Sequence, residues 1–309
     1  MSITGQKKDG PDLDFFILGG SKSGKSALRA YLRTHPRIFM SMRELNFYAD
    51  DLSGSHTYPP RPAKSRQAFC EMFSGAARGQ LLGEASGAYL LSDWAVPNIL
   101  RDNPEARFIV MLRNPIDMAR AMHADLLGRQ IEDERSFQKA WELQDTRAAG
   151  KQIPRACKEP KLLLYRQRSS FASQIERFFQ RVPRERTLVH VFEEFFADPR
   201  AAYQRTLVFL GLPDDGRMHF ARVNEHGVPR TGLLHRLSLN PPFPLDRVFF
   251  PLKRAFNAFG FRPVQAYFRR TLAPPIDPSF RRRIEAELRP DVERLETICG
   301  RDLDVWKFR

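Results

Sequence analysis

The stretch DFFILGGSKSGKSALRAYLRTHP, residues 14–36, decides the fold class of this chain. Its apolar start at Phe15–Leu18 predicts a buried strand, two glycines then allow a turn, and apolar residues at helical spacing continue to Pro36. A strand, a glycine turn and a helix N-terminus together form an anion site, because free backbone N–H groups and the helix dipole favour negative charge. Residues Gly19–Ser26 also read G-x-x-x-x-G-K-S, so the turn predicts a ligand that bears phosphate.

Alternating strands and helices follow this turn along the chain. Further buried strands are predicted at Ile38–Met40, Leu81–Glu84, Phe108–Leu112 and Leu188–Phe192. Helices are predicted at Ala27–Arg33, Trp94–Arg101, Pro115–Leu127, Phe137–Ala148, Ser170–Phe179, Ala201–Leu210 and Phe280–Cys299. This order predicts an α/β fold, a P-loop-type parallel sheet flanked by helices on both faces, with an irregular helical C-terminal extension. We expect one domain over residues 1–309, with a flexible N-terminal tail at 1–13 and the extension at 227–309.

The composition restricts the partners of the chain. Its 309 residues carry a net charge of +14, which suggests an anionic partner such as nucleic acid, a membrane surface, an acidic glycan or a charged nucleotide. The sequence has no helix-turn-helix, RNP or zinc-finger pattern, so nucleic acid is not expected. A polar N-terminus, the lack of an apolar run of membrane-span length and three widely spaced cysteines favour a cytoplasmic protein.

The basic, aromatic segment at residues 243–275 leaves two interpretations open. It contains FFPLKRAFNAFGFRPVQAYFRR, which could rest peripherally on a membrane surface or hold an anionic acceptor. In the alternative, the segment is a packed helical extension whose Phe residues complete the core.

A second anion site is predicted in ARFIVMLRNPIDMARAMHADLLG, residues 106–128. The apolar run ends at Arg113, and Pro115 suits the first position of a helix because its missing N–H would have no partner there. Ligands of open α/β sheets bind at the carboxyl ends of the strands, so a guanidinium at this point predicts a second phosphate site. A kinase remains an alternative, since Glu193 or Glu194 could hold Mg²⁺ after the last strand.

The pairing of GGSKSGKSAL with FIVMLRNPIDMARAM resembles the two cosubstrate motifs of sulfotransferases that use 3′-phosphoadenosine 5′-phosphosulfate (PAPS). Further segments are similar to that family in the same order: HPRIFMSMRELNFYADD, LLGEASGAYLLS, TLVHVFEEFFADPRAAYQRTLVFLGLP and RPDVERLETICGRDLDVW. The resemblance covers most of the chain, thinly at 128–186 and 217–275, and points to the bacterial and carbohydrate-type members. It implies a PAPS-dependent O-sulfotransferase.

The resemblance also assigns cosubstrate contacts. It implies that Lys22 touches the bridging oxygen of the phosphosulfate, within a loop made of Gly20, Ser21, Lys22, Ser23, Gly24, Lys25 and Ser26. Arg113 would bind the 3′-phosphate, with a bidentate geometry that Lys cannot reproduce. Arg230 and Arg236 lie where family members often close a loop over the nucleotide.

Two positions in these motifs depart from the family pattern. Lys25 replaces a threonine, which creates the Walker-like spelling, and its side chain either contacts phosphate or turns to solvent. Ala121 stands where a serine usually binds the 3′-phosphate, so one hydrogen bond worth roughly 1.5–3 kcal/mol is missing. Arg120 could compensate from the neighbouring position.

Glu44 matches the catalytic base of the carbohydrate-type members, although the histidine of their K-E-x-H-F-F motif is Asn46 here. A carboxylate suits a hydroxyl acceptor if partial burial moves its pKa toward neutrality. The alternative for Glu44 is a structural ion pair or a capping role, and His123 is a second candidate base. Glu84 and Ser86 either orient the acceptor or Lys22, or form local turn bonds.

The sequence therefore predicts in-line transfer of a sulfuryl group from PAPS to a hydroxyl acceptor, without a metal. We expect the acceptor to be a sugar or glycan, with a lipid or secondary-metabolite hydroxyl still open. Two alternatives remain: a P-loop kinase that uses ATP and Mg²⁺, and a nucleotide-binding protein without turnover that attaches to membranes through its basic segment.

Overall fold

The computed structural model describes residues 12–52, 63, 65–157, 159–221 and 275–306. These group into two compact units, of which the first comprises the described residues within 12–118, 166–221 and 282–306 and the second those within 119–165 and 275–281. The expected single domain stays a prediction. Most of the predicted tail and of the C-terminal extension, including Arg230 and Arg236, lies outside the described residues.

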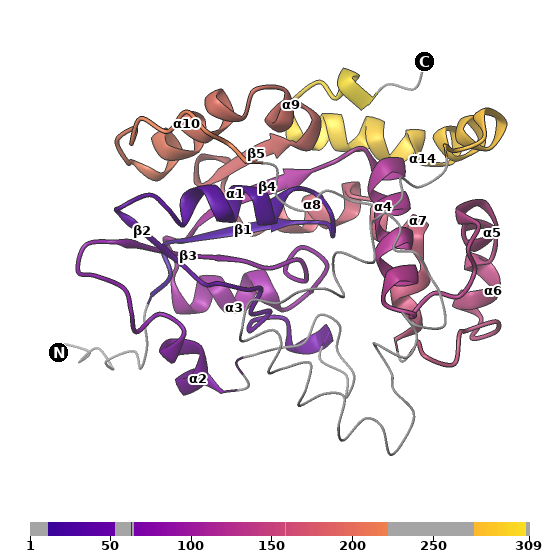
Figure 1. Ribbon diagram of the computed structural model, residues 1–309, viewed down its shortest axis with the longest axis horizontal. Coiled ribbons are helices and arrows are strands. Elements are labelled where there is room, and N and C mark those ends of the chain that lie inside the picture. The colour runs from indigo at the N-terminus through magenta and orange to yellow at the C-terminus, as the bar shows by residue number, and fades with distance from the viewer. Residues whose placement is uncertain (1–11, 53–62, 64, 158, 222–274, 307–309) are drawn as a thin grey trace, which may run out of the picture. The chain divides into compact units, whose positions relative to one another are not determined.

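The first unit is built on a parallel sheet (Figure 1). Its strands are β1 (Phe15–Gly19), β2 (Ile38–Met40), β3 (Leu81–Ala85), β4 (Arg107–Leu112) and β5 (Thr187–Val191), in the spatial order β2-β3-β1-β4-β5. All neighbouring strands pair in parallel, so their carboxyl ends share one edge of the sheet. The predicted strands and their arrangement are confirmed, and the turns that follow β1 and β4 both leave from this edge.

Helices lie between and after the strands along the chain. Within the described residues they are α1 (Lys25–Leu32), α2 (Arg66–Glu71), α3 (Ala95–Asp102), α4 (Pro115–Gly128), α5 (Phe137–Glu142), α6 (Gln144–Ala148), α7 (Tyr165–Ser169), α8 (Ala172–Phe179), α9 (Phe192–Ala197), α10 (Pro199–Leu210) and α14 (Pro278–Cys299). The prediction of a single helix at Phe137–Ala148 is wrong, because this segment forms two helices, α5 and α6. The prediction that Phe192 ends a strand is also wrong, because Phe192 begins α9. None of the helices in the described part of the chain is long and apolar enough to cross a membrane.

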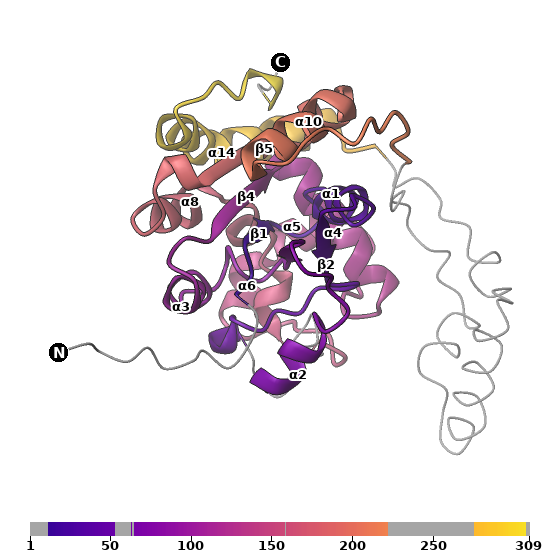
Figure 2. The ribbon, with the colours of Figure 1, turned by 90° about the vertical axis from the view of Figure 1, so that its left-hand side faces the viewer.

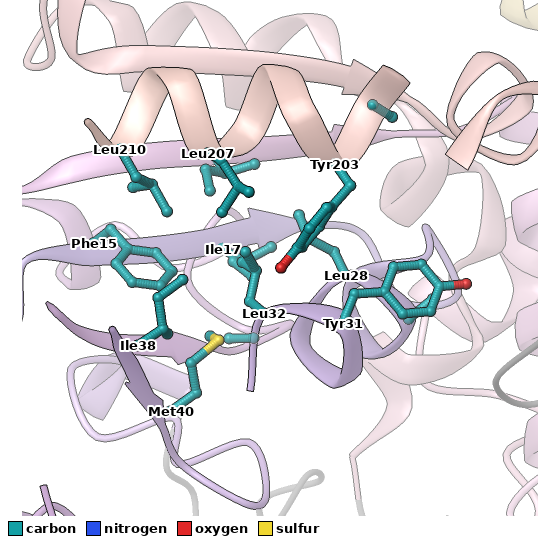
Figure 3. Close-up of a cluster of buried hydrophobic side chains, with 14 of the residues drawn as sticks. Phe15, Ile17, Leu28, Tyr31, Leu32, Ile38, Met40, Tyr203, Leu207 and Leu210 are labelled. Atoms are coloured by element: carbon teal, nitrogen blue, oxygen red, sulfur yellow. The ribbon is translucent and has the colours of Figure 1, made fainter. Parts of the chain in front are cut away.

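One face of the sheet packs against α1 and α10 (Figure 3). Side chains alternate between the two faces of a strand, so Phe15 and Ile17 of β1 point to this side. They pack with Leu28 of α1 and Leu207 of α10 in a buried apolar cluster. Burying this face fixes α1, and thereby the turn that precedes it.

The opposite face of the sheet is aromatic. Phe16 and Phe108 stack with ring centroids 5.9 Å apart, and Phe178 of α8 meets Phe108 edge-on at 5.4 Å. Figure 2 shows α3 and α8 on this side of the sheet and α1 and α10 on the other. The predicted cover of helices on both faces is therefore confirmed.

The second unit has a buried polar network of its own. Arg147 donates two hydrogen bonds of 2.7 Å to the carboxylate of Glu132, which also accepts the Tyr165 hydroxyl at 2.8 Å. His123 is buried beside this pair, within hydrogen-bond distance of the Glu134 carbonyl at 2.8 Å and with its ring 5.7 Å from that of Tyr165. Burial lowers the pKa of His123. These contacts favour a packing role for His123 over the role of a second base.

Candidate active site at the carboxyl edge of the sheet

The turn after β1 is shaped largely by its own residues. Gly19 has φ +141° and Gly24 has φ +95°, conformations that side chains rarely adopt, and a Cβ on Gly19 would lie 2.3 Å from the Met111 carbonyl oxygen. Ser23 donates from its hydroxyl to the Gly20 carbonyl at 2.8 Å. Lys22 also takes a positive φ, +67°, which is unusual for a residue other than glycine. This is the strand, turn and helix arrangement that the sequence predicts for an anion site.

The Lys25 side chain lies inside this turn and bonds its backbone. Its side chain is only 4% exposed, and Nζ donates to the carbonyl oxygens of Gly19 at 3.0 Å and Gly20 at 2.7 Å. Burial lowers the pKa of Lys25, while the negative charge of Glu44 acts in the opposite direction. The solvent-facing alternative for Lys25 is therefore wrong, because its ammonium lies inside the turn.

Arg168 is a cation of this region that the sequence did not predict. Its Nη2 donates to the hydroxyl of Ser21 at 3.2 Å, from the short helix α7. The positive charges of Arg29, Lys22 and Arg168 also lower the pKa of Lys25. No sequence signal could have found Arg168, since 147 residues separate it from its partner in the loop.

Arg113 links the two turns of the edge. It follows β4, and its Nη1 donates to the Lys22 carbonyl at 2.8 Å, while its guanidinium lies 4.2 Å from the ring centre of Phe192. Burial lowers the pKa of Arg113, against the opposite influence of nearby carboxylates. Its Nε is buried and has no hydrogen-bond partner among the residues that the structure describes. A donor of this kind fits a site for an anion such as phosphate.

The two acids that could hold Mg²⁺ in a kinase are already engaged. Glu193 accepts hydrogen bonds from the Asn114 backbone N–H at 3.1 Å and from Trp306 Nε1 at 2.7 Å. Glu194 pairs with Arg301 at 2.6 Å. Both carboxylates therefore hold the C-terminal residues and the turn after β4 in place.

Glu44 lies on the loop after β2, half-buried beside the first turn. One of its oxygens accepts the Gly87 backbone N–H in a weak bond of 3.4 Å. A Cβ on Gly87 would meet Lys25 Nζ and Glu44 Oε2 at 3.4 Å each, so these two charged groups flank the same glycine. The electrostatic influence of Glu44 on both Lys25 and Arg29 places the carboxylate among cations.

Glu84 and Ser86 hold the backbone of this loop rather than facing outward. Glu84 is 0% exposed, and its Oε1 accepts the Leu45 backbone N–H at 3.0 Å. Ser86 Oγ accepts the N–H groups of Leu45 at 3.2 Å and Asn46 at 2.9 Å. Burial raises the pKa of Glu84 to about 7. Of the roles that the sequence leaves open for Glu84 and Ser86, direct orientation of the acceptor is not supported by these contacts, because both side chains are buried and bonded to the loop.

The remaining candidates lie outside the described part of the first unit. Arg120 and Ala121 lie on α4 in the second unit, and Arg230 lies outside the described residues. The structure thus assembles the loop Gly20–Ser26, Arg113 and Glu44 in the first unit, and the contributions of Arg120 and Arg230 stay predictions.

A solved sulfotransferase structure shares this architecture. A crystal structure of a sulfotransferase from Alicyclobacillus acidocaldarius matches with a TM-score of 0.69 and 24% sequence identity, over 96% of this chain and 99% of that one. The chain has the sulfotransferase fold. No protein-family model matches the chain.

A curated protein supports the same conclusion at the level of sequence. Heparan sulfate glucosamine 3-O-sulfotransferase 5 of Mus musculus is 21% identical over 288 residues, which cover 93% of this chain and 72% of that protein. The alignment therefore extends over nearly the whole chain rather than over the turn after β1 alone. The resemblance to sulfotransferases that the motifs predict is confirmed.

Proposed function

We propose that this chain is a PAPS-dependent O-sulfotransferase. The observation that carries the proposal is the hydrogen bond from Arg113 Nη1 to the Lys22 carbonyl, 2.8 Å, which joins the turn after β1 to the turn after β4. Two anion sites held together in this way suit a nucleotide that is phosphorylated at both ends of its ribose. The buried, unpartnered Nε of Arg113, considered among the described residues, supports a phosphate contact there.

The roles of the residues follow from the chemistry of in-line transfer. The oxygen of the acceptor hydroxyl attacks sulfur while Glu44 takes the proton of that hydroxyl. The bond from sulfur to the 5′-phosphate oxygen breaks in the same step. Lys22, with the backbone N–H groups of the loop and Lys25, stabilises the charge that builds on the leaving phosphate. PAP, the desulfated nucleotide, then leaves, and the scheme needs no metal.

We propose a sugar or glycan as the acceptor. The name of the mouse relative states that it sulfates glucosamine in heparan sulfate, and this supports a sugar hydroxyl for the present chain. The placement of Glu44 beside the loop supports a carboxylate base, which is the choice of the carbohydrate-type members that its motif resembles. A lipid or secondary-metabolite hydroxyl is the other outcome of an acceptor screen.

The first test is calorimetry of PAP, ADP and ATP without magnesium. We expect PAP to bind at least about tenfold more tightly than ADP, because ADP lacks the 3′-phosphate that Arg113 would hold. Transfer from PAPS to glucosamine-containing oligosaccharides should then continue in EDTA. Equal binding of PAP and ATP, with turnover that EDTA abolishes, would contradict the proposal and favour the kinase.

The second test separates the base from the binding site. Glu44→Gln should lower kcat roughly 100-fold to 10,000-fold, the range of a lost general base, with the Kd of PAP unchanged. Glu71→Gln, at an exposed acid on α2, is the matched control and should behave as the wild type. A Glu44→Gln variant with full kcat would remove Glu44 from the mechanism.

The kinase alternative is weakened by the bonds that Glu193 and Glu194 already make. One group of carboxylates in the described part of the chain could hold a cation, Glu296, Asp302 and Asp304, and none of them belongs to the loop or to the turn after β4. A cytoplasmic location and a peripheral membrane contact stay proposals, since nearly all of residues 243–275 lies outside the described part. Liposome sedimentation with and without that segment tests the contact.

A further inference from the structure

Glu84 is a fully buried carboxyl group that the proposed reaction does not use. It lies near the end of β3, opposite Phe16 of β1, and is 0% exposed. Its Oε1 accepts the Leu45 N–H at 3.0 Å and the Ser86 hydroxyl, and its Oε2 accepts the Tyr89 hydroxyl at 2.6 Å. One of these donors belongs to the residue directly after Glu44, so the buried carboxyl group is bonded to the loop that carries the proposed base.

The same loop is held at several further points by the segment after β3. Ser86 Oγ accepts the Asn46 N–H at 2.9 Å, and the Gly87 N–H reaches Glu44 Oε2 at 3.4 Å. Asn46 is 2% exposed and has φ +49°, a left-handed conformation that Asn adopts more readily than most residues. The position of Glu44 is therefore set by bonds to its neighbours more than by bonds to its own carboxylate.

We propose that ionised Glu84 is the positioning residue for Glu44, fixing the backbone of the base loop at the edge of the sheet. This inference rests on the proposed function, in which Glu44 is the base. A carboxylate can accept all three donors, Leu45 N–H, the Ser86 hydroxyl and the Tyr89 hydroxyl, whereas a neutral carboxyl group must itself donate from one oxygen. Hydrogen bonds to the charged form are also the stronger ones. Loss of the charge therefore loosens the hold on the loop.

Glu84 gains or loses its proton near neutral pH, because its pKa lies at about 7. Burial raises the pKa of Glu84 to about 7, although the bonds from Ser86, Tyr89 and Leu45 act in the opposite direction. The charge of Glu44 raises this pKa further, while the positive charges that act on the pair are Arg29, which interacts with both carboxyl groups, and Lys25, which interacts with Glu44. Tyr89 stays neutral, because burial raises its pKa well above the ordinary value. The hold on the loop should thus weaken as the pH falls through about 7.

Glu84→Gln tests the proposal because glutamine has the same size and is permanently neutral. At pH 8.5 its kcat should be about 10-fold to 100-fold below that of the wild type, with PAP bound equally tightly, since a misplaced catalytic group costs rate rather than nucleotide affinity. At pH 5.5, where the wild-type carboxyl group is itself protonated, the two rates should converge. Glu105→Gln, at an exposed acid before β4, is the matched control and should follow the wild type at every pH.

A double variant distinguishes positioning from general damage to the fold. If Glu84 acts through Glu44, adding Glu84→Gln to Glu44→Gln should cause no further loss of kcat. Losses that multiply in the double variant, or a Glu84→Gln variant that binds PAP more weakly in proportion to its lost rate, would overturn the proposal.

A readout without activity keeps this inference separate from the proposed function. Backbone amide exchange at pH 8 should be at least tenfold faster in Glu84→Gln for the peptide containing Leu45 and Asn46, and unchanged for residues 19–26. Unchanged exchange at Leu45 and Asn46 overturns the positioning role, even if transfer is confirmed. A wild type that fails to bind PAP overturns the proposed function and leaves the exchange result standing.

Tyr89→Phe provides a milder variant in case Glu84→Gln does not fold. This variant removes only the hydroxyl that donates to Glu84 Oε2. Because that hydrogen bond favours the ionised form, its loss should raise the pKa of Glu84. The pH at which kcat is half-maximal should therefore move upward, with little change of kcat at pH 9. A profile identical to that of the wild type contradicts the proposal.

Discussion

The two turns at the carboxyl edge of the sheet are built in different ways. The turn after β1 is closed by bonds between near neighbours, since Lys25 Nζ reaches carbonyl oxygens only five and six residues away. The turn after β4 is held from far along the chain: Arg113 bonds a residue 91 positions away, and Asn114 bonds a residue 79 positions away. The first turn therefore has a local framework to which Arg113 and Arg168 add distant contacts, whereas the second turn depends mainly on the tertiary fold.

This difference explains why the sequence motif of the first turn, Gly19–Ser26, is longer than that of the second, Arg113–Pro115. Local hydrogen bonds require particular residues at fixed spacing, and the glycines and lysines of the first turn meet that requirement. The supports of the second turn can come from any element that reaches it. Here they come from Phe192 and Glu193 of α9, and from Trp306 near the end of the described chain.

The largest expected effect comes from removing Arg113, the residue that joins the two turns. Arg113→Ala should weaken PAP binding by about 3 kcal/mol, on the order of 100-fold in Kd, because it deletes charge-assisted bonds to phosphate and the bond to the Lys22 carbonyl. Calorimetry without magnesium measures this loss. Arg107→Ala, at the exposed opposite end of β4, is the control and should bind PAP normally. An Arg113→Ala variant with wild-type affinity would show that the second turn is not a phosphate site.

A second variant acts on the local turn alone. Lys25→Met keeps the length of the side chain but removes the ammonium that bonds two carbonyl oxygens. We expect a Kd for PAP roughly 10-fold to 30-fold higher, since the loop loses both its internal brace and a cation.

Lys139→Met, at an exposed lysine of α5, controls for the loss of one positive charge. If Lys25→Met binds PAP as tightly as the wild type, the shape of the loop does not depend on Lys25 and the first turn is less local than its bonds suggest.

Acid should act on β5, the strand that pairs with β4 and leads into α9. Burial lowers the pKa of His190 in β5 to about 3, below the unfolded value near 6.5, so the unfolded chain binds a proton first and stability is lost as the pH falls below that value. Between pH 7.5 and 5.5 this group should cost about 1.4 kcal/mol of unfolding free energy.

Urea unfolding at both pH values, on the wild type and on His190→Gln, measures the effect. The variant should lose less stability between the two pH values than the wild type does. An equal loss in both proteins would mean that His190 does not remain neutral in the fold.

The smallest expected effect concerns Trp306, which reaches the second turn only through Glu193. Trp306→Phe keeps an aromatic side chain, although a smaller one, but removes the Nε1 donor to Glu193, which in turn accepts the Asn114 N–H. The Kd of PAP should rise about threefold, because the change reaches the phosphate site only through two intervening groups. Trp94→Phe, at an exposed tryptophan, is the control. A loss as large as that of Arg113→Ala would mean that Trp306 holds the whole turn rather than one bond in it.

Much of the fold could be predicted from hydrophobic patterns. The buried strands read as short apolar runs, and each was placed to within one residue. Errors arose where tertiary contacts override local preference: Phe137–Ala148 breaks into two helices, and Phe192 leaves the sheet to stack on Arg113. The candidate site was predicted where residues lie in one motif, as with Lys22, and missed where they do not, as with Arg168.

By itself, the sequence determined the parallel sheet, the glycine turn after β1 and the kind of ligand that such a turn favours. Each depends on residues that are neighbours along the chain, where spacing alone fixes geometry. Only the tertiary structure decided that Lys25 lies inside the turn, that Glu193 and Glu194 hold the C-terminal residues, and that Glu84 bonds the loop of Glu44. Those outcomes depend on burial and on partners far apart in sequence, because a buried charge takes whichever partner the packed elements bring to it.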